Sequence, residues 1–384
     1  MKNTTRFQAI AFAAIRLVIN SMHRMVYPFL TVFSRGLGVD LVTLSRLLAV
    51  RSLVGMIGPL LATIADSRGR KLTMVFGLGV FTLGTSLVVF WPTIPTFAAA
   101  LMLTMLGKMM FDPPMQAYIG DRVPYARRGR VLAVTELGWS LSFVIGVPLM
   151  GFLISRWGWM SPFWALMLLG IICIILLYWM IPKDSFAGDQ AANIFSNIQK
   201  VLRFTPAIAG LAIGMFSSAA NEVINLVFGV WMETSFGLQI AALGAAAAVI
   251  GLAELSGESL VGFFVDRLGK PRAISFGLLT NCLSALIFPS LGQTLPGAVL
   301  GLFLFYLSFE FTLVSTIPMM TEIVPTARAT MMAMNITAIS LGRALGAFVA
   351  PTLFAWGMGT SAAAAIVFNL LALMALRWVR YQGT

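Results

Sequence analysis

Residues 262–270 read Gly262-Phe263-Phe264-Val265-Asp266-Arg267-Leu268-Gly269-Lys270, and a related stretch, Ala65-Asp66-Ser67-Arg68-Gly69-Arg70-Lys71, lies 200 residues earlier. A second pair agrees: Asp121-Arg122-Val123-Pro124-Tyr125-Ala126-Arg127 and Glu322-Ile323-Val324-Pro325-Thr326-Ala327-Arg328 stand 201 residues apart. Two matches at nearly the same offset indicate an internal duplication. The sequence therefore predicts two similar halves.

About twelve apolar stretches surround these loops. A membrane-spanning helix needs about 20 mostly apolar residues. The stretches are 9–31, 43–64, 72–91, 95–118, 131–154, 162–182, 206–231, 239–263, 273–291, 295–318, 330–356 and 361–379. We expect an all-α polytopic membrane protein with twelve transmembrane helices in two six-helix pseudo-symmetric bundles. The bundles would be residues 1–182 and 206–384, joined by a cytoplasmic linker at 183–205.

The composition excludes an ordinary soluble protein. Of the 384 residues, 59% are hydrophobic and 10% are charged, against roughly 25% charged in soluble domains. The first apolar stretch is too long for a signal-peptide core and indicates an uncleaved first span. Cys173 and Cys282 lie inside apolar spans, where cysteine packs as a small hydrophobe.

The net charge of +12 orients the chain rather than indicating a nucleic-acid partner. With the N-terminus placed in the cytoplasm, basic residues gather in alternate loops on that side. The opposite side holds only Arg35, Arg46 and Arg156. This positive-inside bias predicts a multi-pass protein of the inner (plasma) membrane with both termini cytoplasmic.

The stretch from Gly262 resembles the signature loop of the major facilitator superfamily: a glycine, three residues, Asp-Arg, any residue, then Gly-Lys or Gly-Arg. The first-half copy departs from it, with Ala62 in place of the glycine and Ser67 in place of the arginine. The resemblance implies a secondary transporter whose substrate binds between the halves near the bilayer midplane. It also implies that the third, sixth, ninth and twelfth spans face lipid.

The repeated loops have a readable physical role. The glycine at 262 would allow close helix approach, and Gly69 and Gly269 would allow a tight turn. The acidic and basic side chains would form a gating latch that holds one face closed; the alternative is a solvated turn. The latch residues would be Asp66, Arg70, Asp121, Arg127, Asp266, Arg267, Glu322 and Arg328.

Ionisable residues inside the apolar spans are the main functional signal. Each costs about 2.5–3.5 kcal/mol at a helix centre facing lipid, so they must face one another or water. The third, sixth and ninth spans carry none, and the twelfth carries only Arg377 at its cytoplasmic end. This pattern agrees with the lipid-facing positions that the resemblance implies.

These residues and their polar neighbours share helix faces, such as Arg16, Asn20, His23 and Tyr27 in the first span. Candidate substrate-cavity residues are Arg16, Asn20, His23, Tyr27, Arg51, Lys108, Trp139, Asn225, Tyr306 and Arg343. Candidate proton-coupling residues are Glu222, Glu254, Glu310, Glu136 and Asp112. The alternative is that such groups form internal ion pairs that fix helix packing.

The halves differ in the sign of their buried charge, the first mostly basic and the second mostly acidic. A carboxyl group in a low-dielectric cavity has a raised pKa, which makes proton uptake near neutral pH possible. Gly146-Val147-Pro148-Leu149-Met150-Gly151 resembles, in part, the drug-efflux motif of the family. We therefore expect a proton-coupled exporter (antiporter) of amphiphilic small molecules.

Two alternatives remain open: a carrier for an organic anion or sugar-like solute, and a lipid or lysolipid flippase. An enzyme is not expected, because the sequence has no nucleotide loop or serine elbow, and its single histidine speaks against a metal site. No cofactor is expected. The partners would be a small-molecule substrate, protons and the lipid bilayer, with no nucleic acid, and a monomer suffices.

Overall fold

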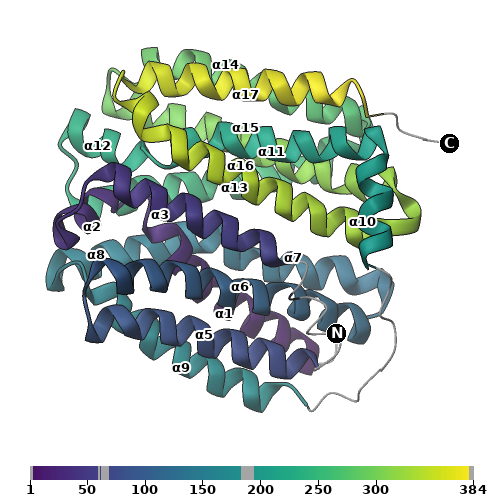
Figure 1. Cartoon of the computed structure of the whole chain (residues 1–384), viewed down its shortest axis with the longest axis horizontal. Helices are drawn as coiled ribbons and strands as arrows, with labels where there is room; N and C mark the ends of the chain where they lie inside the picture. The colour runs from purple at the N-terminus through teal and green to yellow at the C-terminus, as the bar shows by residue number, and fades with distance from the viewer. Residues whose placement is uncertain (1–2, 59–60, 62–68, 183–193, 380–384) are drawn as a thin grey trace. The chain divides into compact units, whose positions relative to one another are not determined.

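The computed structural model describes residues 3–58, 61, 69–182 and 194–379, and these residues form helices and no strands (Figure 1). The earlier helices are α1 (Asn3–Met25), α2 (Leu30–Leu37), α3 (Leu41–Val54), η1 (Gly55–Ile57), α5 (Arg70–Phe90), α6 (Ile94–Arg122), α7 (Tyr125–Leu141), the π-helical turn η2 (Ser142–Gly146), α8 (Val147–Trp157) and α9 (Ser161–Met180).

The later helices are α10 (Ile194–Arg203), α11 (Thr205–Asn225), α12 (Phe228–Phe236), α13 (Ile240–Leu268), α14 (Lys270–Leu291), α15 (Leu295–Ile323), η3 (Pro325–Ala327), α16 (Arg328–Phe354) and α17 (Met358–Leu376). Among the described residues, ten helical segments are long and apolar enough to span a membrane. A bent pair, α1 and α2 with a 68° turn, makes eleven if it counts as one span. The expected span at 43–64 lies partly outside the described residues.

Helix boundaries repeat along the chain as the duplicated loops predict. α1 ends at Met25 and α11 at Asn225, and the short helices that follow, α2 and α12, both end before a left-handed glycine, Gly38 and Gly237. Gly69 and Gly269 precede α5 and α14 with φ of 96° and 79°. Only glycine adopts such angles easily, so the predicted tight turns are present.

Local sequence also explains where matching helices begin. α6 starts after Thr93, which forms a capping box with Thr96, and α15 starts after Thr294, whose side chain accepts a hydrogen bond from the Gly297 amide. Each helix has a proline in its first turn, where the missing N–H costs nothing.

The chain divides into two compact units. The first contains Met1–Asp40, Leu60–Gln190 and Leu238–Gly251; α1 packs against α7 and η2 there, and α5 against α6 and α9. The second contains Leu41–Pro59, Ala191–Gly237 and Leu252–Thr384; α11 packs against α16 and α17, α14 against α15, and α3 against α16. The helices of each unit thus include one segment from the other half of the sequence.

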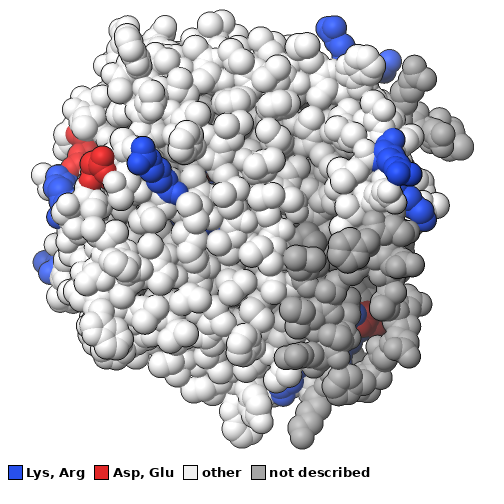
Figure 2. Space-filling model, in the orientation of Figure 1, with Lys and Arg blue, Asp and Glu red and all other residues white. Residues whose placement is uncertain are grey.

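The helices α5, α9, α14 and α17 correspond to the third, sixth, ninth and twelfth expected spans. All four expose large apolar side chains, as a lipid-facing helix should. Examples are Phe76, Leu83, Leu168, Ile172, Ile175, Leu279, Leu286, Val367 and Leu370. On the face drawn in Figure 2, charged side chains lie mostly near the helix ends, and the surface between them is uncharged.

Candidate functional site

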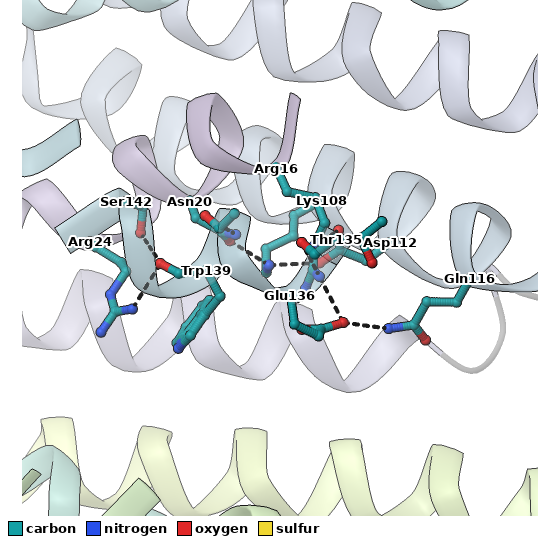
Figure 3. A network of polar contacts seen from close by, with 11 residues as sticks. Arg16, Asn20, Arg24, Lys108, Asp112, Gln116, Thr135, Glu136, Trp139 and Ser142 are labelled. Atoms are coloured by element: carbon teal, nitrogen blue, oxygen red, sulfur yellow. Dashed lines mark hydrogen bonds and ion pairs between the residues drawn. The ribbon is translucent and has the colours of Figure 1, made fainter. Parts of the chain in front are cut away.

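A cluster of charged side chains joins α1, α6 and α7 in the first unit (Figure 3). Arg16 Nη1 lies 2.7 Å from Glu136 Oε1, and Arg16 Nε lies 3.2 Å from Asp112 Oδ1. The Arg16 side chain is 6% exposed. Arg16 also donates a hydrogen bond to the Thr135 carbonyl at 3.0 Å. One guanidinium therefore holds two carboxylates and the backbone of α7.

Lys108 completes the cluster from α6. Its Nζ lies 2.7 Å from Asp112 Oδ2, one turn away, and donates to Asn20 Oδ1 at 2.6 Å. Asn20 in turn donates to the Gly138 carbonyl at 3.4 Å. The i, i+4 spacing of Lys108 and Asp112 thus forms an ion pair, and α1 contributes both Arg16 and Asn20.

The cluster holds two cations and two carboxylates, so its formal charge is balanced. The carboxylates differ in exposure: the Asp112 side chain is 13% exposed and that of Glu136 is 41% exposed. Gln116 donates to Glu136 at 3.3 Å. Glu136 is therefore the member that water reaches most easily.

Close helix approach makes this cluster possible. A Cβ at position 138 would lie 2.5 Å from the Ala13 carbonyl oxygen, and one at position 146 would lie 1.9 Å from Ser21 Oγ. Gly138 and Gly146 thus allow α1 to lie against α7 and η2. The π-helical turn η2 ends at Gly146, the first residue of the partial efflux motif, and the rest of the motif lies in the first turns of α8.

Arg24 lies one turn after Asn20 on α1 and packs against two aromatic rings. Its guanidinium carbon is 3.5 Å from the Phe143 ring centroid and 4.2 Å from that of Trp139, and Arg24 donates to the Trp139 carbonyl at 3.2 Å. His23 lies 6.1 Å from the Trp139 ring and 6.4 Å from the Tyr27 ring. The predicted polar stripe of α1 is therefore buried as a unit.

The second unit buries acidic side chains. Glu222, Glu254 and Glu310 are 1%, 3% and 5% exposed. Asn225 donates to Glu222 Oε2 at 3.3 Å, and Tyr306 donates to Asn225 Oδ1 at 2.7 Å. A chain of hydrogen bonds therefore runs from a tyrosine through an amide to a carboxylate.

Two further polar groups on α11 are buried beside this chain. Ser218 Oγ and Asn221 Nδ2 have no hydrogen-bond partner among the described residues, although their residues are 1% and 5% exposed. An unsatisfied buried polar group costs about 1–3 kcal/mol. Such groups occur where a ligand or water supplies the partner.

Two further predicted cavity residues, Arg51 and Arg343, lie on helices of the second unit. Arg51 on α3 is 1% exposed and belongs to the second unit, whereas Arg16 and Lys108 belong to the first. Arg343 on α16 is half-buried.

Three of the eight expected latch residues, Arg70, Asp121 and Glu322, form ion pairs. Arg70 pairs with Asp121 in the first unit, and Lys270 pairs with Glu322 in the second. The two pairs occupy equivalent places, each joining the start of one helix to the end of the next. Sequence reasoning missed Lys270, although it aligns with Arg70 at the same offset of 200 residues.

The other latch positions are not brought together in the described residues. Arg267 and Arg328 are exposed and form no ion pair with a described residue. Asp66 lies outside the described residues, as do the side chains of Arg127 and Asp266. The close approach expected at Gly262 is not found within the described part of the chain, where nothing lies within 4 Å of a Cβ at that position.

Sequence reasoning also missed an uncharged network in the second unit. Asn281 on α14 donates to the Phe305 carbonyl at 2.7 Å and to Ser308 at 2.9 Å, and Asn369 on α17 donates to Asn281 at 2.6 Å. The spans that carry no charge thus use asparagine to join one another. Polar residues at span interfaces were the available signal.

Comparison with known sequences gives consistent matches. The Major Facilitator Superfamily profile matches residues 12–220 and 210–383. An MFS-type transporter of Bacillus subtilis, YbcL, is 23% identical over 90% of this chain and 88% of its own. The inner membrane transport protein YdhP of Escherichia coli is 25% identical (92% and 91%), and multidrug resistance protein 2 of B. subtilis is 22% identical (90% and 86%).

Solved structures share the fold. A bacterial homologue of the human lysosomal transporter Spinster, inward-facing and unoccupied, superposes with a TM-score of 0.78 at 12% identity, covering 99% of this chain and 95% of its own. A D-xylose–proton symporter superposes with a TM-score of 0.77 at 16% identity, covering 98% and 96%.

Proposed function

The chain belongs to the major facilitator superfamily of membrane transporters, and on that premise we propose that it is a proton-coupled exporter of amphiphilic small molecules. Members of the family are transporters, not enzymes. Export by alternating access would use the proton gradient across the inner membrane, with both termini in the cytoplasm. The similarity to multidrug resistance protein 2 supports this substrate class.

The observation that carries the proposal is the burial of Glu222 beside Asn225 and Tyr306. An ionised carboxylate loses much free energy when it leaves water, and taking up a proton removes that cost. The hydrogen bond to Glu222 from Asn225 comes from a neutral amide. The burial of Glu222 therefore supports a role in proton uptake.

The unsatisfied groups on α11 support substrate binding at the same place. Ser218 and Asn221 lie within one turn of Glu222 and offer a hydroxyl and an amide donor. A substrate that fills these positions would compete with, or depend on, the protonation state of Glu222. This proximity along α11 would be the physical basis for coupling substrate to proton movement.

The cluster around Arg16 would supply the second part of the cycle. A proton delivered to Glu136, the more exposed carboxylate, would remove one anion from Arg16, which links α1, α6 and α7. The proposed role of the cluster is to change the packing of α1 when a proton arrives. The pairs Arg70–Asp121 and Lys270–Glu322 would act as the gating latch that fixes each loop between conformational changes.

A carrier for organic anions is the second candidate. Arg24, Lys108 and Arg16 lie on or against one helix and are 3%, 8% and 5% exposed. Arginine recognises carboxylate and phosphate through two parallel hydrogen bonds. Under this alternative, an anionic group would bind beside Arg24 and the rings of Phe143 and Trp139.

The deciding experiment uses purified protein in liposomes that contain a pH-sensitive dye. Cationic, zwitterionic and anionic amphiphiles, sugars and small organic acids are added in turn. Proton movement evoked by cationic or zwitterionic amphiphiles supports the exporter. Proton movement evoked by organic acids alone supports the anion carrier, and transport of any class without proton movement contradicts proton coupling.

A further inference from the structure

A pocket of about 790 Å³ lies in the second unit where α10 meets the start of α11 and the end of α17. Its walls include Arg203, Phe204, Met374, Arg377 and Trp378. This volume falls within the range of small-molecule pockets, about 300–1,000 Å³. None of these residues takes part in the transport proposal above.

Among the described residues, this pocket is lined by two arginines and no acidic side chain. Arg203 and Arg377 are exposed and form no ion pair or side-chain hydrogen bond with a described residue. Neither residues 190–221 nor residues 323–384 contain an Asp or Glu. Lys200, one turn before Arg203, adds a further exposed cation. No carboxylate among the described residues offsets these cations, so the site favours an anion.

The pocket also lies at the ends of two apolar spans. α11 and α12 form one apolar span that begins at Thr205, and the span α17 ends at Leu376. The residues just outside these ends, Phe204 and Trp378, are 40% and 67% exposed. Aromatic side chains at span ends prefer the headgroup layer.

Apolar surface continues from the pocket along α17. Met374, Leu370 and Val367 are 59%, 44% and 55% exposed and follow one another at intervals of three to four residues. A molecule with an anionic head in the pocket could therefore lay an acyl chain along this stripe. A soluble anion would leave the stripe unused.

We propose that this pocket binds the headgroup of an anionic phospholipid, with the phosphodiester between Arg203 and Arg377. Arginine pairs with phosphate in a bidentate geometry, and basic pockets between spans recognise acidic headgroups in this way. A zwitterionic lipid brings a cationic amine or choline, for which these residues offer no carboxylate. The pocket therefore selects phosphatidylglycerol-type lipids over phosphatidylcholine.

The test is native mass spectrometry of the detergent-solubilised full chain, titrated with dioleoylphosphatidylglycerol or dioleoylphosphatidylcholine. We expect one phosphatidylglycerol to bind at least about tenfold more tightly than phosphatidylcholine. Each arginine near the headgroup contributes about fivefold. The double variant Arg203→Gln/Arg377→Gln should therefore bind both lipids alike, and Arg377→Gln alone should lose about fivefold.

The matched control is Arg272→Gln, which removes an exposed arginine at the start of another span in the same unit. It should leave the lipid preference unchanged. The proposal is overturned if the double variant keeps the preference, or if the control loses as much. Equal binding of soluble glycerol 3-phosphate would also overturn it, because the site would then take a phosphate ester without using the acyl chain.

Discussion

The Nη1 atom of Arg16 lies 2.7 Å from Oε1 of Glu136 and so ties the middle of α1 to α7. The same guanidinium lies 3.2 Å from Asp112 on α6. The two carboxylates are not equivalent, because Asp112 is 13% exposed and also pairs with Lys108, whereas Glu136 is 41% exposed. Because of this difference in burial and pairing, we expect substitutions of Asp112 and Glu136 to change the stability of the protein by different amounts.

Replacing Asp112 should cost far more stability than replacing Glu136. Asp112→Asn removes the carboxylate partner of Lys108 and leaves Arg16 with Glu136 alone, and breaking a buried pair costs about 3 kcal/mol or more. Glu136→Gln removes a partly solvated charge and should cost about 1 kcal/mol or less. Thermal unfolding of the two variants in the same detergent measures the difference. Equal losses would contradict the ranking.

Proton coupling through Glu222 predicts a separation of two transport modes. Glu222→Gln should lower the rate of proton-driven transport by at least about tenfold. Substrate counterflow should stay near the wild-type rate, because exchange needs no net proton movement. Both modes are measured in the same liposomes. Loss of both would assign Glu222 to substrate binding or packing.

The control for this variant is Glu233→Gln. Glu233 lies on α12, within the same apolar span as Glu222, and is only partly buried. It should leave both modes unchanged. Loss of proton-driven transport in the control would mean that any carboxylate on this span affects coupling.

The sequence alone predicts much of this arrangement because its signals are local. The spacing of Arg16 and Asn20 by four residues predicts one helix face, and both do lie in one network. Gly69 and Gly269 are predictable as turns because a left-handed backbone angle requires glycine. The uncharged spans are predictable as lipid-facing because an isolated charge there is costly.

Pairing between distant residues is not local and was not predictable. Arg16 reaches Asp112 and Glu136 across 96 and 120 residues (112 − 16 and 136 − 16), and no periodicity specifies those partners. The participation of Gln116 and Lys270 depends on helix packing in the same way. Close helix approach at Gly262 was predicted from the residue type alone, and a glycine does not show whether a neighbouring helix is present.

The pair Arg70–Asp121 should control access more than stability. Exposed ion pairs contribute about 1 kcal/mol or less, so Asp121→Asn should change the unfolding temperature little. In a protein that also carries Asn225→Cys, Asp121→Asn should raise the rate at which a membrane-impermeant maleimide labels the cysteine by at least about threefold. The charge-swapped variant Arg70→Asp/Asp121→Arg should restore the original rate. Unchanged labelling in Asp121→Asn would remove the latch role.

Gly346 on α16 provides a test of whether Glu222 depends on close helix packing. A Cβ at position 346 would lie 2.7 Å from Glu222 Cβ and 2.9 Å from the Ala219 carbonyl oxygen. Gly346→Ala must therefore push α16 away from α11, and overpacking of this kind costs about 1–3 kcal/mol. We expect a lower unfolding temperature together with weaker proton-driven transport.

Gly79→Ala is the matched control, since a Cβ at that position in the interior of α5 meets nothing within 4 Å. Alanine is the better helix former by up to about 1 kcal/mol, so this variant should be as stable as the wild type or more so. If Gly346→Ala lowers stability and spares proton-driven transport, the exact position of α16 against Glu222 does not govern coupling. If both variants behave alike, the contact between α11 and α16 is looser than the 2.7 Å approach implies.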